Sequence, residues 1–162
     1  MSLKIMVLSD SFHISTEAIR YSIALAKRLD AVLVLLMLLP FELTPKTPGG
    51  VDTVLKLQSR AAEALRQLIS DMERGGMSVE GAIRIGNPRS ELLKFLAESG
   101  KFHSIVWGGG PDSINDRSHW TSNLEADVKC SVLVPLIKSE QEFGRRSGRF
   151  REQRRVRKEW RK

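Results

Sequence analysis

The chain has 162 residues, of which 41% are hydrophobic and 28% charged, so it can bury the core of one ordinary domain beneath a polar surface. Its single cysteine excludes an internal disulfide, and its three histidines are too scattered for the spacing of a metal site. The net charge of +7 is concentrated at the end, because residues 145–162 hold ten Lys or Arg and two Glu, while the remaining sixteen basic and seventeen acidic residues nearly cancel.

We therefore divide the chain into a domain over residues 1–138 and a basic C-terminal tail over residues 139–162. The charge of residues 145–162 predicts binding to nucleic acid or to an anionic membrane surface, and the alternative is a solvated extension with incidental affinity for polyanions. The N-terminus is not typical of a secretory signal, and the longest apolar run, residues 31–41, falls below the ~20 residues that span a bilayer. We predict a cytoplasmic protein without a transmembrane segment.

Strand-like and helix-like segments alternate in the first half of the chain. Residues 3–8 form an apolar run that predicts a buried strand, and Ser15 stands where the N-cap of a helix over residues 16–30 is expected. Residues 31–39 are apolar on both faces, which predicts a central strand covered on both sides. After a loop rich in proline and glycine, residues 51–73 carry the pattern of a long amphipathic helix.

The second half continues the alternation. Residues 77–86 alternate as a strand does, and Gly81 within them indicates a bulge or an edge. Asn87 predicts the cap of another helix, which has a proline at its first position and ends at Gly100. The remaining elements are a strand, a short helix and a final strand, over residues 103–107, 119–128 and 131–137.

Strands that alternate with helices predict an α/β fold, a doubly wound sheet of five parallel strands with right-handed crossovers. In such a sheet, ligands bind beyond the carboxyl ends of the strands at the topological switch point. The loop over residues 9–15 and the glycines that follow residue 107 stand at this position. We expect any ligand of the chain to bind there.

Three stretches resemble the universal stress protein family. The opening of the family is similar to KIMVLSDSFHISTEAIRYSIALAKRLDAVLVLLMLL, its later part to IRIGNPRSELLKFLAESGKFHSIVWGGG, and its last strand to CSVLVP. The resemblance covers residues 3–137 and keeps the order of the elements. It implies a sheet of the adenine nucleotide alpha-hydrolase-like type with strand order 3-2-1-4-5, and a non-enzymatic role in signalling or stress protection. It also implies a homodimer through the last strand, although Pro135 interrupts regular pairing there.

The resemblance implies the phosphate side of a nucleotide site, and this side departs from the family pattern. Nucleotide-binding members carry Gly-x-x-Gly and, about nine residues later, Gly followed by Ser or Thr, whose backbone amides contact phosphates. Gly108 matches the first glycine, but the second falls on Pro111, which has no N–H to donate. Gly109 and Gly110 are the candidates to compensate, since a triple glycine can still shape an anion-binding nest.

The final pair of that pattern is ambiguous. Counting forward from the glycines places it on Thr121 and Ser122, whereas counting backward from CSVLVP places it nearer Ser118 and His119. Neither position offers a glycine. The resemblance therefore implies that ATP or AMP binds weakly or not at all, with an ATP-binding switch through residues 108–110 as the rival hypothesis.

The adenosine side follows the family more closely. Asp10 matches an acidic residue that accepts hydrogen bonds from ribose or adenine, with Ser11 beside it, and Met37 or Leu38 would give the base an apolar wall. An alternative is that Asp10 caps the first helix or accepts from loop amides.

No catalytic residue is predicted. Asp10, Ser11 and His13 are too close together in one loop to adopt the geometry of a catalytic triad, so we predict no enzymatic activity. Cys130 is interpreted as a small buried hydrophobic residue, with a reactive thiol as the alternative. Trp107 is predicted to pack in the core.

Overall fold

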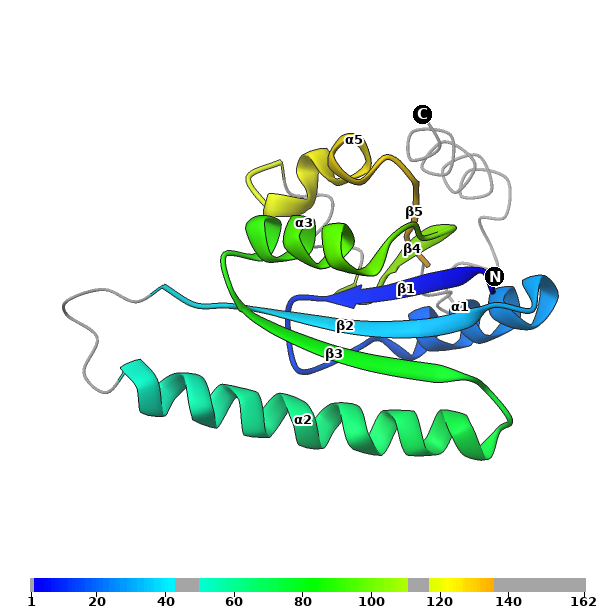
Figure 1. Ribbon diagram of the computed structural model, residues 1–162, viewed down its shortest axis with the longest axis horizontal. Helices are drawn as coiled ribbons and strands as arrows, with labels where there is room; N and C mark the ends of the chain where they lie inside the picture. Colours follow the sequence, from blue (N-terminus) through cyan, green and yellow to red (C-terminus); the bar gives the residue numbers. More distant parts are fainter. Residues whose placement is uncertain (1, 43–49, 111–116, 136–162) are drawn as a thin grey trace, which may run out of the picture.

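A computed structural model gives the structure of the protein and describes residues 2–42, 50–110 and 117–135. Strands and helices alternate along the chain, as the sequence predicts (Figure 1). The elements are β1 (Lys4–Ser9), α1 (Thr16–Leu29), β2 (Val32–Pro40), α2 (Gly50–Arg74), β3 (Val79–Gly86), α3 (Pro88–Ser99), β4 (Ser104–Trp107), the 3₁₀ helix η1 (Trp120–Asn123), α5 (Leu124–Val128) and β5 (Ser131–Leu133).

The five strands form one parallel sheet in the order β3-β2-β1-β4-β5, which confirms the predicted fold class and strand order. Helices cover both faces: α1 and α2 pack on one face, and α3 and α5 on the other (Figure 1). The predicted central strand over residues 31–39 is β2, which lies between β3 and β1 and is almost wholly buried.

The core is divided into two layers by the alternation of side chains along the central strands. Val7 of β1 points toward α1 and α2, and its neighbour Leu8 points toward α3 and α5. Because both faces of these strands are covered, the sequence of β1 and β2 is a continuous apolar run rather than an alternating one.

Two helix caps predicted from the sequence are confirmed. The Ser15 hydroxyl accepts a hydrogen bond from the Ala18 amide at the start of α1, and the Asn87 side chain accepts one from the Ser90 amide at the start of α3. Each cap satisfies an amide that has no partner within its own helix, and so fixes where the helix begins.

The structure differs from the predicted boundaries near the end of the domain. The short helix predicted over residues 119–128 is divided into η1 and α5, and Asn123 joins them in a non-helical conformation. The sequence predicts the last strand over residues 131–137, but β5 ends at Leu133. Pro135 lacks an amide to donate to a neighbouring strand, which is consistent with the early end of β5.

Some predictions concern parts of the chain that lie outside the described residues: Pro111, the domain boundary at residue 138, and the basic tail over residues 139–162. Within the ranges that the structure describes, none of the helices combines the length and the apolar character needed to cross a bilayer.

Candidate functional site

The candidate site lies at the carboxyl ends of β1 and β4, which are neighbours in the sheet. The register of the two strands places Leu8 beside Trp107, so the loop after β1 and the glycines after β4 leave the sheet at the same edge. The segment that begins at His119 returns to this edge. It brings residues about 110 positions apart in the sequence into contact with Asp10.

The loop after β1 is closed on itself by serine side chains. The buried Ser9 hydroxyl donates to the backbone carbonyl of His13 at 2.8 Å and accepts from the Ser11 amide at 3.2 Å. The exposed Ser11 hydroxyl donates to the same His13 carbonyl at 3.0 Å. The hydroxyl of Ser11, a predicted ligand contact, is therefore used to stabilise its own loop.

Asp10 accepts two side-chain hydrogen bonds from the other side of the site. Its Oδ2 atom lies 2.9 Å from Nε2 of His119 and 3.1 Å from Nε1 of Trp120. The Asp10 and His119 side chains are only 17% and 20% exposed, so water competes weakly for this interaction. The carboxylate that the family resemblance assigns to ribose or adenine is thus bonded within the chain to two ring N–H groups, and the cap of α1 is Ser15 rather than Asp10.

Thr121 fixes the orientation of the His119 ring. The Thr121 amide donates to Nδ1 of His119, which leaves Nε2 as the nitrogen that carries the proton donated to Asp10. The Thr121 hydroxyl also lies 2.7 Å from Nδ1. Asp10, His119 and Thr121 therefore form a hydrogen-bonded row like that of a hydrolase, but its hydroxyl is completely buried and cannot reach a substrate.

Three rings form an aromatic cluster beside Asp10. Trp107, His119 and Trp120 lie with ring centroids 5.8 to 5.9 Å apart, and Trp107 meets both of the others edge to face. Trp107 is 1% exposed, which confirms its predicted place in the core, and its indole N–H donates to the Gly110 carbonyl at 2.7 Å. The cluster holds the segment from His119 to Thr121 against the end of β4.

Each of the three glycines has a role in packing or in backbone conformation. A Cβ at Gly108 would lie 2.9 Å from the Ile14 side chain, and one at Gly109 would lie 2.5 Å from the Trp107 ring. Gly110 has a φ of +92°, which side chains rarely allow. The Gly108 amide also donates to the Leu8 carbonyl, so this amide is used within the sheet.

The remaining predicted residues are placed as follows. Met37 and Leu38 are 1% and 0% exposed and belong to the two cores on opposite faces of β2, so neither presents accessible surface to a base. Thr121 is buried and bonded to His119, and Ser122 is exposed on η1 with its amide donating to the His119 carbonyl. The structure brings Asp10 close to Thr121 through His119 but leaves Met37 and Leu38 inside the core.

Sequence reasoning missed His119 and Trp120 as the partners of Asp10. One signal was present, because the backward count from the last strand placed the phosphate-binding pair nearer Ser118 and His119. A histidine and a tryptophan in adjacent positions supply two ring N–H donors, and a buried Trp N–H usually finds an acceptor. The pairing of these donors with Asp10 required the three-dimensional fold.

Burial also governs two ionisable groups in the segment that leads from the site to β5. Burial raises the pKa of Glu125, and burial together with the negative charge of Glu125 raises the pKa of the Cys130 thiol to about 11. Cys130 is therefore a neutral thiol near neutral pH, which supports its interpretation as a small apolar residue. Among the residues that the structure describes, no group of three His, Cys, Asp or Glu side chains could hold a metal ion.

Several solved structures share this fold. A universal stress protein family protein from Burkholderia pseudomallei is 20% identical, with 83% of this chain and 96% of that chain covered and a TM-score of 0.63. Universal stress protein UspA from Lactobacillus plantarum is 21% identical, with coverage of 82% and 97% and a TM-score of 0.59. A universal stress protein family protein from Arabidopsis thaliana, solved with AMP bound, is 13% identical, with coverage of 86% and 94% and a TM-score of 0.58.

At these identities the solved structures show a common fold and no more. A comparison with curated proteins gives no match. The family model provides the decisive evidence, because the model of the universal stress protein family matches residues 1–134, which include every described helix and all five strands of the sheet. The chain belongs to the universal stress protein family.

Proposed function

We propose that the protein is a non-enzymatic signalling or stress-protection module that binds adenine nucleotides weakly or not at all. The observation that carries this proposal is the pair of hydrogen bonds from His119 and Trp120 to Asp10. A ribose hydroxyl or an adenine amino group would have to share this carboxylate, whose Oδ2 atom already accepts from two ring N–H donors.

A nucleotide that binds to Asp10 exchanges hydrogen bonds within the chain for hydrogen bonds to the ligand. A hydrogen bond to a charged group contributes about 1.5–3 kcal/mol to stability, and a buried donor that loses its acceptor costs a similar amount. A nucleotide that takes Asp10 from His119 and Trp120 must replace both bonds and also disturb the aromatic cluster around Trp107. These costs lower the net affinity for a nucleotide at this place.

The phosphate side supports the same proposal. The Gly108 amide donates to Leu8, and the glycine positions are explained by the close approach of Ile14 and of the Trp107 ring. AMP stays among the ligands to be tested because one structural neighbour, the Arabidopsis protein, was solved with AMP bound.

Two hydroxyl groups at the site and the thiol of Cys130 before β5 support the absence of catalysis. The Thr121 hydroxyl is buried, the Ser11 hydroxyl donates to its own loop, and the raised pKa of Cys130 keeps its thiol neutral. None of these three groups combines access to a substrate with an activated nucleophilic form.

Calorimetric titration with ATP and with AMP, each with and without magnesium, tests the proposal. We expect no saturable heat at ligand concentrations up to about 1 mM, which corresponds to a binding free energy weaker than roughly −4 kcal/mol. The rival hypothesis, an ATP-binding switch through residues 108–110, predicts a Kd tighter than about 10 μM, or roughly −7 kcal/mol, that is lost in Asp10→Ala. That result would overturn the proposal.

Association through the basic residues 145–162 is a second proposal, based on their ten Lys or Arg. It predicts salt-dependent binding to nucleic acid or to anionic vesicles that disappears when the chain is cut after Lys138. Equal binding by the truncated chain would contradict it. The cytoplasmic location and the homodimer through the last strand also stay predictions.

A further inference from the structure

The indole ring of Trp120 is held at the candidate site in the way that a separate ligand would be. Its N–H group donates to Oδ2 of Asp10 at 3.1 Å, and its ring meets the Trp107 ring edge to face at a centroid distance of 5.9 Å. The His119 ring, tilted by 38°, contacts it at a centroid distance of 5.8 Å. A hydrogen bond to a carboxylate together with two ring contacts is the kind of environment that orients a planar ligand in a pocket.

An indole and a purine have the same outline. Each consists of a five-membered ring fused to a six-membered ring, and adenine, like indole, carries N–H donors at the edge of its aromatic plane. The side chain of Asp10 is 17% exposed, and its carboxylate accepts hydrogen bonds from either kind of ring. The groups around Trp120 therefore supply what a purine ring requires, an acceptor at one edge and aromatic rings beside it.

Side chains, rather than backbone hydrogen bonds, attach the indole ring to this site. Among the described residues, no backbone hydrogen bond joins residues 119–123 to a strand of the sheet, and the Ser122 amide donates to the nearby His119 carbonyl. Trp120 is the first residue of η1 and is partly exposed to solvent. Its ring can therefore turn away from Asp10 without breaking the pairing of the strands.

The chain after η1 is anchored independently of Trp120. Leu124, at the start of α5, is 1% exposed and belongs to the core on the α3 side. Asp127 of α5 also forms an ion pair with Arg89 of α3 at 2.8 Å. Asn123 joins η1 to α5 in a non-helical conformation, with φ of −117° and ψ of 22°. A change in the position of the indole ring therefore leaves the contacts of α5 in place.

The other groups of the site also keep their own support when the indole ring leaves. Trp107 is 1% exposed, and its N–H donates to the Gly110 carbonyl at 2.7 Å. The His119 ring accepts a hydrogen bond from the Thr121 amide at 3.3 Å. A wall and a carboxylate that are already in place lower the cost of ordering the site around an incoming ring.

We propose that Trp120 is an internal ligand, which occupies the place of a purine ring and has to leave before such a ring can bind to Asp10. This role of Trp120 rests on the proposed function, because it gives the reason that adenine nucleotides bind weakly: the chain's own ring competes with them. Since the indole belongs to the same chain, its effective concentration at the site is high. A free ligand binds only to the fraction of molecules in which the ring has left, and its apparent Kd rises accordingly.

Removal of the indole ring tests this role. Trp120→Ala opens the place of the ring while His119 keeps its hydrogen bond to Asp10, whereas Trp120→Phe removes the N–H donor but leaves a ring in place. Calorimetric titration of the full chain with AMP measures each Kd, and ribose 5-phosphate is the control ligand because it has no purine ring. Circular dichroism confirms that each variant folds.

We expect Trp120→Ala to bind AMP at least about tenfold more tightly than the wild type, with a Kd below about 100 μM, and free indole to compete with AMP for the opened place. Trp120→Phe should gain less, because a ring still fills that place. Addition of Asp10→Ala to Trp120→Ala should abolish the gain. Ser122→Ala, at an exposed position of η1, is the matched control and should behave as the wild type.

A folded Trp120→Ala that binds AMP no better than the wild type overturns the role of Trp120 and leaves the proposed function intact. So does a variant that binds ribose 5-phosphate as tightly as AMP, because its gain does not come from a ring site. A wild type that binds AMP more tightly than about 10 μM overturns the proposed function and the role of Trp120 with it. If Trp120→Ala does not fold, nuclear magnetic resonance of the wild type at about 10 mM AMP decides. The indole N–H signal of Trp120 must then shift more than that of Trp107, and an unchanged signal overturns the proposal.

Discussion

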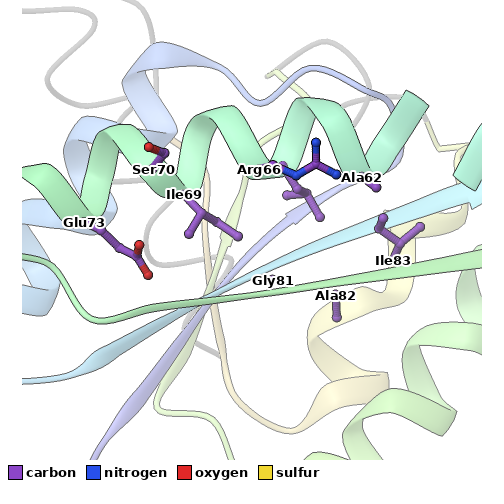
Figure 2. A pocket seen from close by; sticks show the side chains of 9 residues that line it. Ala62, Arg66, Ile69, Ser70, Glu73, Gly81, Ala82 and Ile83 are labelled. Carbon is purple, nitrogen blue, oxygen red and sulfur yellow. The ribbon is translucent and has the colours of Figure 1, made fainter. Parts of the chain in front are cut away.

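The candidate site and the outer edge of β3 differ in how far their polar groups are hydrogen-bonded within the chain. At the site, the carboxylate of Asp10, the Gly108 amide and the indole N–H of Trp107 all form hydrogen bonds within the chain. At the edge, Gly81 directs its backbone groups away from the sheet, next to an open groove between α2 and β3 (Figure 2), while the outward carbonyl of Ile83 accepts a hydrogen bond from Arg84.

This difference in hydrogen bonding affects where the chain can bind a ligand or another protein. A polar group that is already paired offers a ligand only an exchange of hydrogen bonds, whereas an open strand edge gains hydrogen bonds when a strand is added. The site to which the family resemblance points is already paired within the chain, whereas β3 is an end strand of the sheet with backbone groups that point away from β2.

The first prediction concerns the packing that closes the site. Trp107→Ala removes a ring that is 1% exposed and contacts both His119 and Trp120, so we expect a loss of about 3–5 kcal/mol in the free energy of unfolding. Urea denaturation measures it, with Leu93→Ala on the exposed side of α3 as the control. A loss below about 1 kcal/mol would show that the aromatic cluster does not hold the site closed.

The second prediction concerns the polar half of the same contact. Asp10→Ala leaves the ring N–H groups of His119 and Trp120 without their acceptor, which we expect to cost about 1–3 kcal/mol of folding free energy. Asp71→Ala is the matched control, because Asp71 forms an exposed ion pair with Arg74 that contributes about 0–1 kcal/mol. Equal losses in the two variants would mean that Asp10 is free to serve a ligand.

The fold could be predicted from the sequence because its signals are local and repeated. The apolar run of residues 31–39, the caps at Ser15 and Asn87 and the alternation of elements each depend on a few neighbouring residues. The end of the last strand was less predictable. The apolar pattern of residues 131–137 continues beyond the point at which β5 ends.

The position of the site could be predicted from the sequence, but the hydrogen-bond partners of its side chains could not. Asp10 and Gly108 follow strands that are adjacent in the sheet, so topology alone brings them together. What the sequence could not give is the choice of hydrogen-bond partners. The contact of Asp10 with His119 joins positions that are 109 apart, and no local pattern specifies it.

The third prediction compares a crowded glycine in each region. A Cβ at Gly109 would lie 2.5 Å from the Trp107 ring, and one at Gly81 would lie 2.6 Å from the end of the Ile69 side chain. The buried ring cannot move without disturbing His119, whereas the end of an isoleucine can rotate into the groove. We expect Gly109→Ala to cost about 1–3 kcal/mol and Gly81→Ala less than about 1 kcal/mol in urea denaturation. The reverse order would contradict the contrast between a tightly packed site and an open edge.

The smallest effect is expected at Cys130, which packs against the core on the α3 and α5 side. Its pKa of about 11 means that the folded chain holds far less thiolate at pH 8 than the unfolded chain, so iodoacetamide should react at least about tenfold more slowly before denaturation than after it. The pKa is raised on folding, so the neutral thiol contributes stability that is present below the usual thiol pKa and is lost as the pH rises through about 11. Glu125→Gln removes the negative charge that adds to the effect of burial and should increase the alkylation rate modestly. If the folded and unfolded chains react equally fast, Cys130 is open to solvent in the folded chain, and its packing against the core on the α3 and α5 side does not protect it.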